Sequence, residues 1–304
     1  MNTFPTLIRR EWMQHRFGWT LLALVPLAIA LFGLAVGNID IEFDTAERGG
    51  AGFPTLLAMI AMGGGTVATF VILSATSLIL ITGLARRDHG DRSVEFWLSL
   101  PTSHSASLAA PLVTHLLLVP AAALVVGLAG GWLVSAVLVT RLSGFGAWLS
   151  LPWGDLVPAG LALVLRGLVG LPLAVMWAAP LLLAVVLANA YLKRWGLPAL
   201  LLALTLGGLL LDRWLGQGAV TDTVGAILRH AGQSLLGADQ QALQAESQQL
   251  PAESLRLVPA WLFKDFLVAL KALASPLFAG CVLTSAVLFA LLLDWRQRGA
   301  SAAN

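Results

Sequence analysis

The chain has 304 residues, of which 58% are hydrophobic and 11% are charged, and its formal net charge is +2. Soluble domains average about 45–50% apolar and about 25% charged residues, so this composition excludes a soluble protein and predicts an integral membrane protein. The small net charge gives no reason to expect nucleic acid as a partner. The single cysteine, Cys281, excludes a disulfide within one chain.

Apolar stretches of membrane-spanning length recur along the whole chain. A helix that crosses the hydrocarbon core of a bilayer needs about 20 mostly apolar residues. Six stretches fit, at about residues 19–37, 55–84, 108–139, 168–190, 197–211 and 275–293. The sequence therefore predicts an all-α membrane protein with six spans, built as a single domain over residues 1–304.

The side on which the chain ends lie follows from the basic residues. An even number of spans puts both termini on one side, and Lys and Arg near span ends collect on the cytoplasmic side. The residues that share the side of the termini are Arg9, Arg10, Arg16, Arg86, Arg87, Arg92, Lys193, Arg194, Arg296 and Arg298. We therefore expect cytoplasmic termini, and no cleaved signal peptide, because the first apolar run is longer than a usual signal sequence.

An amphipathic pattern precedes the first apolar stretch. Phe4, Ile8 and Trp12 recur every fourth residue, whereas Arg9 and Arg10 lie elsewhere on the helix. The pattern predicts a short helix on the inner membrane face, or equally a basic flank that anchors the first span.

The longest segment between spans, residues 212–271, is expected to form an outer loop. Leucines spaced among glutamines and acids predict that part of it is amphipathic helix, whose apolar face needs the membrane or another chain for burial. Trp261 and Phe263 are expected to anchor the chain at the interface before the last span.

Catalytic motifs do not occur in the sequence. None of the lysines, Lys193, Lys264 and Lys271, follows the glycine spacing of a phosphate-binding loop, and neither HExxH nor GxSxG is present. The histidines do not pair with one another at metal-ligand spacing, and the acidic residues 40–47 read as a solvated loop. We therefore expect no enzyme, no metal site and no cofactor bound by this chain.

Arg166 lies within an apolar stretch, where an ionised side chain is costly. It either lines a translocation cavity or snorkels from an interfacial helix at the outer membrane face. The excess length of residues 158–192 favours the second interpretation.

Small and hydroxylated residues mark two of the predicted spans. Gly127 and Gly131 have the GxxxG spacing that lets helix backbones approach closely. In the second span a group of polar residues falls near one face: Thr66, Thr69, Thr76 and Ser77. Packing within one subunit is favoured over a dimer seam or a polar pathway.

A polar, aromatic segment, ARRDHGDRSVEFWLSLPTSH, separates the second and third spans at residues 85–104. Its second half predicts a short helix from Ser93 to Leu100 that ends at Pro101. Phe96, Trp97 and Leu100 share one face, and Glu95 points away. Aromatic residues at this position need either the lipid interface or a groove in another protein to bury them.

The segment RSVEFWLSLPTSHSASLAAPLV resembles the motif of bacterial ABC type 2 exporter permeases, in which an acidic, aromatic stretch ending in Leu-Pro forms a coupling helix. RREWMQHRFGW is similar to the connecting helix of that family, which the resemblance assigns to Arg9, Arg10, Glu11 and Trp12. PLAVMWAAPLLLAVVLANAYLKRWGLP resembles its fourth span and the following inner loop. Where family members often carry a lysine after the Leu-Pro, this chain has Ala109, Ala110 and Pro111.

The resemblance implies the transmembrane subunit of an ATP-driven exporter in the bacterial inner membrane. It implies a second permease subunit, identical or different, and separate ATPase subunits that bind ATP and Mg²⁺. The residues that would dock on the ATPase are Ser93, Glu95, Phe96, Trp97, Leu98, Leu100 and Pro101. The alternative is an accessory membrane component that transmits force or scaffolds a complex without passing a substrate.

Overall fold

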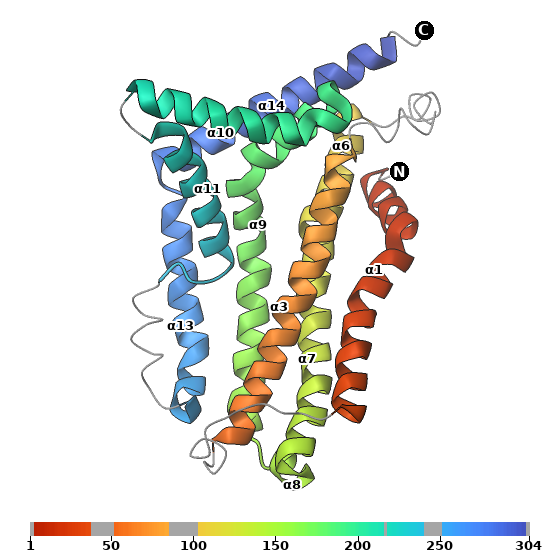
Figure 1. The fold of residues 1–304 in the computed structure, drawn as a ribbon, viewed down its shortest axis with the longest axis vertical. Coiled ribbons are helices and arrows are strands. Elements are labelled where there is room, and N and C mark those ends of the chain that lie inside the picture. The colour runs from red at the N-terminus through yellow and green to blue at the C-terminus, as the bar shows by residue number, and fades with distance from the viewer. Residues whose placement is uncertain (1–2, 38–51, 85–102, 216–217, 240–250, 302–304) are drawn as a thin grey trace.

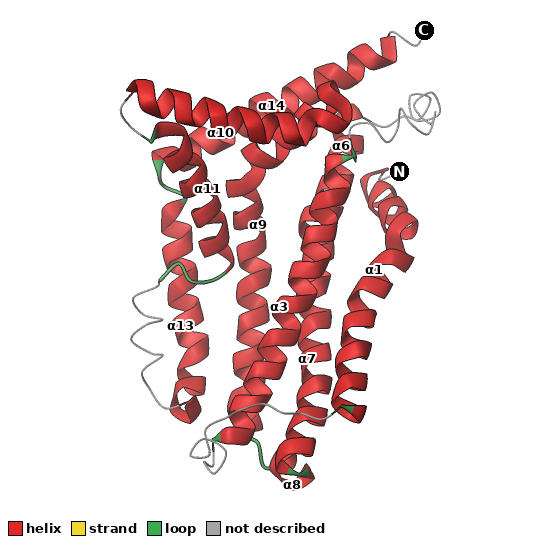
Figure 2. Cartoon of the chain, viewed as in Figure 1, coloured by secondary structure: helices red, strands yellow, loops and turns green. Residues whose placement is uncertain are grey.

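The computed structural model describes residues 3–37, 52–84, 103–215, 218–239 and 251–301, and these residues form helices and short connections without a strand (Figure 2). A helix satisfies its backbone hydrogen bonds internally, which apolar surroundings require. The elements are α1 (Thr3–Val36), α3 (Phe53–Thr82), α6 (His104–Val113), η1 (Thr114–Leu118), α7 (Val119–Ser143), α8 (Phe145–Leu149), α9 (Trp153–Leu192), η2 (Lys193–Trp195), α10 (Gly196–Leu215), α11 (Ala219–Leu235), α13 (Pro251–Ala272) and α14 (Pro276–Ser301).

The long helices α1, α3, α7, α9 and α13 form a bundle, and α10 and α14 cross one end of it (Figure 1). That end also carries the start of α1, the end of α3 and the start of α6, and we call it the N-terminal end. The opposite end carries α8, and we call it the α8 end. There Arg141, near the end of α7, donates hydrogen bonds to the carbonyls of Leu34 and Gly37 at the end of α1.

Five stretches of the described helices are long and apolar enough to cross a membrane. They are Phe4–Val36, Phe53–Thr82, Ser105–Ser143, Trp153–Trp214 and Pro276–Gln297. The first three and the last overlap the predicted first, second, third and sixth spans. The predicted fourth and fifth spans, 168–190 and 197–211, fall together in the stretch from Trp153 to Trp214, so the described chain has five candidate spans rather than six.

The chain changes direction between the predicted fourth and fifth spans. Lys193 has a positive φ of 58°, in a short 3-10 turn that separates α9 from α10. The Asn189 side chain accepts a hydrogen bond from the backbone N–H of Leu197 at 3.1 Å, which holds the turn. α10 then crosses the N-terminal end, as does α14 (Figure 1). An apolar run of spanning length therefore does not by itself determine the direction of its helix.

The segment predicted as an outer loop, 212–271, contains α11 and α13, and both helices pack against α9. The expected amphipathic helix is present as α13, and its apolar face is buried by a neighbour within the same chain. Leu255, Trp261 and Leu262 are buried there, whereas Phe263 is exposed. The expectation that Trp261 is an interfacial anchor is therefore wrong, because this indole lies inside the bundle.

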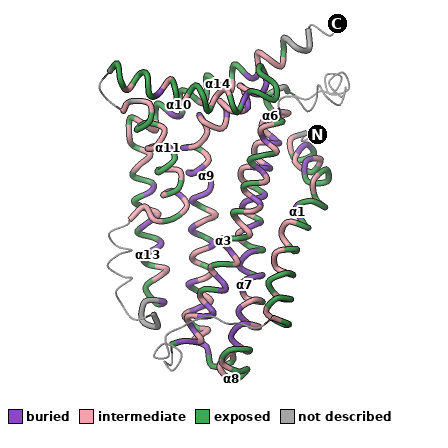
Figure 3. Tube along the Cα trace, in the orientation of Figure 1, coloured by how far each residue is buried: buried purple, intermediate pink, exposed green. Residues whose placement is uncertain are grey.

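Buried residues gather on α3, α7 and α9, whereas α1 and α10 are largely exposed (Figure 3). α1 is one continuous helix, so its amphipathic segment and its apolar segment form a single element. Trp19 packs it against Leu73 of α3 and Val119 of α7. The exposed side of α1 is apolar, as a surface facing lipid requires, and includes Phe17, Leu21, Leu24, Val25, Ile29 and Phe32.

Candidate functional site

Arg166 and Asp265 form an ion pair in the interior of the bundle. Arg166 lies on α9 and is 3% exposed, and Asp265 lies on α13 and is 0% exposed. Nε and Nη2 of Arg166 donate to Oδ2 of Asp265 at 3.0 and 2.8 Å. Ionised groups at such positions face a partner, because an isolated charge in apolar surroundings is costly.

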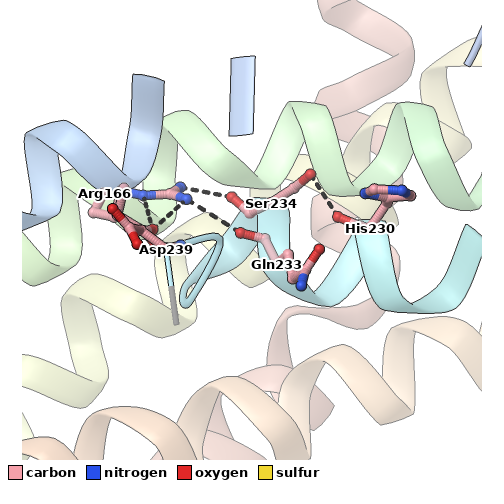
Figure 4. A network of polar contacts seen from close by, with 6 residues as sticks. Arg166, His230, Gln233, Ser234 and Asp239 are labelled. Carbon is pink, nitrogen blue, oxygen red and sulfur yellow. Dashed lines mark hydrogen bonds and ion pairs between the residues drawn. The ribbon is translucent and has the colours of Figure 1, made fainter. Parts of the chain in front are cut away.

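The C-terminal end of α11 completes the surroundings of the guanidinium (Figure 4). Nη1 of Arg166 donates to the carbonyl of Ser234 at 2.6 Å, and Nη2 donates to the carbonyl of Gln233 at 3.2 Å. The last carbonyls of a helix carry partial negative charge, so a cation is favourable there. The other oxygen of Asp265, Oδ1, accepts the backbone N–H of Asp239 at 2.8 Å. We call these five residues the Arg166 cluster.

The Arg166 cluster ties three helices together. The guanidinium joins α9 to α11 and α13, and its centre also lies 5.6 Å from the ring of Phe266. The interfacial, snorkelling arrangement that the sequence favoured for Arg166 is therefore wrong. The physical reason is that Asp265 and the α11 carbonyls provide the partners that water would otherwise supply.

An aromatic pair extends the cluster along α11. The imidazole of His230 stacks on the indole of Trp177, with ring centroids 4.5 Å apart and planes 18° from parallel. The hydroxyl of Ser234 donates to the carbonyl of His230 at 2.7 Å (Figure 4). Trp177 is fully buried on α9, so this stack is a second link between α9 and α11.

An apolar pocket lies one helical turn from the Arg166 cluster, between α3, α7, α9 and α13. Its lining includes Leu163, three residues before Arg166, and Trp261, four residues before Asp265. Thr66 also lines it, but the Thr66 hydroxyl donates to the carbonyl of Met62 within its own helix, at 2.7 Å. The pocket therefore offers apolar surface, suited to hydrocarbon groups.

The predicted GxxxG pair lies in a close contact between α3 and α7. A Cβ atom added to Gly127 would meet the Cα of Thr66 at 2.8 Å, and one added to Gly131 would meet the Cα of Met62 at 2.7 Å. Gly65 of α3 faces the same contact, 2.9 Å from the Cα of Gly131 by the same measure. We call this contact the glycine seam. The structure places both predicted glycines in packing within one chain.

The hydroxylated residues of α3 differ in burial and in hydrogen bonding. The hydroxyls of Thr66 and Thr76 bond to carbonyls one turn earlier in the helix, at 2.7 and 2.9 Å. Ser77 is buried, and its hydroxyl has no hydrogen-bond partner within the described residues. Thr69 is half-buried. Two of these hydroxyls are thus engaged by their own helix.

Of the two segments that the resemblance assigns to coupling, only one lies within the described residues. The segment from Ser93 to Pro101 lies outside the described residues. The segment assigned as a connecting helix lies in α1, where Arg9 and Trp12 are exposed, Arg10 is half-buried and Glu11 is buried. Glu11 lies near His115 of η1, a proximity that no spacing in the sequence indicates.

No protein-family model, curated protein or solved structure matches the chain. The fold and the buried site define its class as a multi-pass α-helical membrane protein, in which apolar helices enclose a satisfied ion pair.

Proposed function

We propose that the chain is the membrane-spanning permease subunit of an ATP-driven exporter, paired with a second permease subunit and served by separate ATPase subunits. The observation that carries the proposal is the Ser-Val-Glu-Phe-Trp-Leu-Ser-Leu-Pro segment at 93–101, which lies in the chain between α3 and α6. Its resemblance to a coupling helix is the reason for proposing an exporter subunit. The helices that flank it provide a path by which movement of this segment would reach the rest of the bundle.

The flanking helices are built to move together. α6 continues through η1 into α7, and α7 packs along α3 through the glycine seam. A displacement applied to residues 93–101 would reach both α3 and α7, which form one body because their backbones touch. Rigid-body motion of packed helices is a common way of switching access between two faces.

The surroundings of this pair fit a permease. The start of α1 contacts α6, so the basic, amphipathic segment of α1 lies at the N-terminal end of the bundle, where α6 begins. The apolar pocket between α3, α7, α9 and α13 borders the glycine seam through Met62 and Thr66. Motion of α3 against α9 and α13 would therefore change the shape of this pocket.

Copurification tests the proposal. The ATPase that copurifies with the chain from its native membrane is first identified. Its binding to purified variants of the chain is then measured. Truncating a large side chain at an interface hot spot costs about 2 kcal/mol or more, about thirtyfold in affinity. The double variant Phe96→Ala/Trp97→Ala should therefore lose most of its ATPase binding. The control is Phe145→Ala/Leu149→Ala, two exposed apolar residues on α8 at the other end of the bundle, which should bind normally.

The outcomes separate the two candidate roles. Loss of binding in the Phe96/Trp97 variant, with normal insertion and normal binding by the α8 control, supports a coupling helix. ATPase binding without any substrate movement in reconstituted vesicles supports the accessory component instead. Undiminished ATPase binding and transport by the Phe96/Trp97 variant contradicts the coupling role.

A further inference from the structure

Three side chains that can bind metal meet at the N-terminal end of the bundle. Glu11 and His15 lie one turn apart on one face of α1, and His115 lies on η1. Nε2 of His115 is 3.8 Å from Oε2 of Glu11, and one ligand atom from each of the three residues lies within 4.8 Å of the others. Glu11 and His115 are each 1% exposed, and His15 is half-buried.

A local irregularity in the third apolar stretch positions His115. Residues Thr114–Leu118 form one turn of π-helix, in which the N–H of Val119 bonds to the carbonyl of Thr114, five residues earlier. Pro120 follows directly and has no N–H to donate. Single π-turns inside α-helices change the direction of a side chain and occur frequently at functional sites.

The imidazole of His115 is incompletely satisfied. Its Nδ1 is buried and has no hydrogen-bond partner within the described residues. Its Nε2 lies farther from Glu11 than a hydrogen bond allows. The indole of Trp19 stands edge-on to this ring, with the ring centroids 5.4 Å apart, and both side chains are buried. A buried ring nitrogen without a partner is costly, and a cation coordinated at that nitrogen would remove the cost.

We propose that Glu11, His15 and His115 bind a divalent transition-metal ion such as Zn²⁺. Two imidazoles and one carboxylate are a donor set that suits Zn²⁺ rather than Ca²⁺ or Mg²⁺, which prefer oxygen ligands. Metal–ligand bonds of about 2.0–2.2 Å place ligand atoms roughly 3–4 Å apart, so the three residues need only a small closure around the ion. Three protein ligands leave a fourth position for water or another ligand.

The site has an entry route and a mechanical consequence. A cleft at the N-terminal end is lined by His15 together with Thr82, Asn189, Lys193 and Leu197, so His15 is reachable from outside the bundle. The bound ion fastens α1, the first helix of the chain, to η1, which follows α6 and the segment 85–102 in the sequence. The proposal does not depend on the exporter function, because it rests on the geometry of these three residues.

Metal binding to the tag-free full-length chain in detergent tests the site. The chain is stripped with a chelator, titrated with Co²⁺ and Zn²⁺, and assayed by Co²⁺ absorption and by elemental analysis after desalting. We expect one ion per chain, and a loss of affinity of at least about tenfold in His15→Gln and in Glu11→Gln, since even outer-shell changes cost about 10–100-fold. His230→Ala, which removes a histidine stacked on Trp177 away from the site, should bind as the unchanged chain does.

A thermal measurement guards against variants that fail to fold. His15 is half-buried and its replacement by Gln keeps a polar side chain of similar reach, so this variant should remain monodisperse. Zn²⁺ should raise the melting temperature of the unchanged chain and of His230→Ala, but not that of His15→Gln. Equal metal content, or an equal thermal shift, in the unchanged chain and in His15→Gln would overturn the proposal and leave a simple Glu11–His115 contact.

Discussion

Arg166 on α9 donates from both Nε and Nη2 to the same carboxylate oxygen of Asp265 on α13, although the two residues are 99 positions apart in the chain. Both side chains are withdrawn from solvent. Bringing two charges out of water costs several kcal/mol for each ion, and their attraction offsets that cost only when the remaining donors and acceptors are satisfied. The Ser234 and Gln233 carbonyls and the Asp239 N–H meet this condition.

Replacing only one member of this pair should destabilise the bundle strongly. Arg166→Leu leaves the carboxylate of Asp265 buried without its cation, and losses of this kind reach about 3–5 kcal/mol. We expect a loss of this size in the free energy of unfolding, measured by denaturant titration in detergent micelles. The double variant Arg166→Leu/Asp265→Leu should lose less than Arg166→Leu alone, because neither charge then remains buried.

An exposed ion pair in the same chain provides the control. Nε of Arg256 on α13 lies 3.2 Å from the carboxylate of Asp155 on α9, and the Arg256 side chain is mostly exposed. Exposed pairs of this kind contribute about 0–1 kcal/mol. Arg256→Ala should therefore change the unfolding free energy by less than about 1 kcal/mol. If Arg166→Leu costs no more than Arg256→Ala, the Arg166 cluster does not stabilise the bundle.

Asp265 was not predicted as the partner of Arg166, because hydropathy was averaged over the whole segment that carries it. Lys264, Asp265 and Lys271 lower the average hydropathy of α13, so the sequence placed this segment in an outer loop. Packing depends on one face rather than on the average, and Leu255 and Trp261 provide an apolar face that α9 buries. A single acidic residue flanked by Leu262, Phe263, Phe266 and Leu267 was the signal in the sequence that could have indicated a buried ion pair.

Local spacing predicted some features well, whereas contacts between distant segments escaped it. The GxxxG spacing of Gly127 and Gly131 indicated close backbone packing, and the structure shows that packing against α3. The approach of Glu11 to His115 depends on how α1 crosses η1, which no periodicity encodes. The direction of α10 depends on the turn at Lys193, so the apolar runs alone did not show that the predicted fourth and fifth spans fall in one candidate stretch.

The orientation of the bundle can be tested with single cysteines. Cys281 is buried and would first be replaced by alanine. Phe145 on α8 and Trp195 on η2 are exposed residues at opposite ends of the bundle. Basic residues near helix ends, among them Arg9 and Arg194, favour the cytoplasm for the N-terminal end. A membrane-impermeant thiol reagent should therefore label Phe145→Cys in cells where the membrane that holds the chain is intact and reachable by the reagent, but leave Trp195→Cys unlabelled until that membrane is opened.

Both cysteine variants should react fully after solubilisation in detergent, which establishes that each thiol is accessible. Labelling of Trp195→Cys in intact cells, without labelling of Phe145→Cys, would reverse the orientation. Labelling of both in intact cells would mean that the two ends do not lie on opposite sides of the membrane.

The close contact at the glycine seam predicts that adding one methyl group there destabilises the packing of α3 against α7. A Cβ atom at Gly131 would lie 2.7 Å from the Cα of Met62, a distance that real Cβ atoms essentially never show. Because backbone cannot swing aside as a side chain can, α3 and α7 must separate. Overpacking of this kind costs about 1–3 kcal/mol. Gly131→Ala should therefore lower the unfolding free energy in detergent by that amount and should also impair any transport that needs α3 and α7 to move as one body.

Gly64→Ala is the matched control, since Gly64 lies on α3 beside the seam but a Cβ atom there meets nothing within 4 Å. Replacing a helical glycine by alanine without a clash stabilises by about 0.4–1 kcal/mol, because it reduces the freedom of the unfolded chain. The two substitutions make the same chemical change in neighbouring helices and should shift the melting temperature in opposite directions. Equal shifts would mean that α3 and α7 are not in backbone contact at Gly131, and the route from residues 93–101 to the apolar pocket would then lack its rigid link.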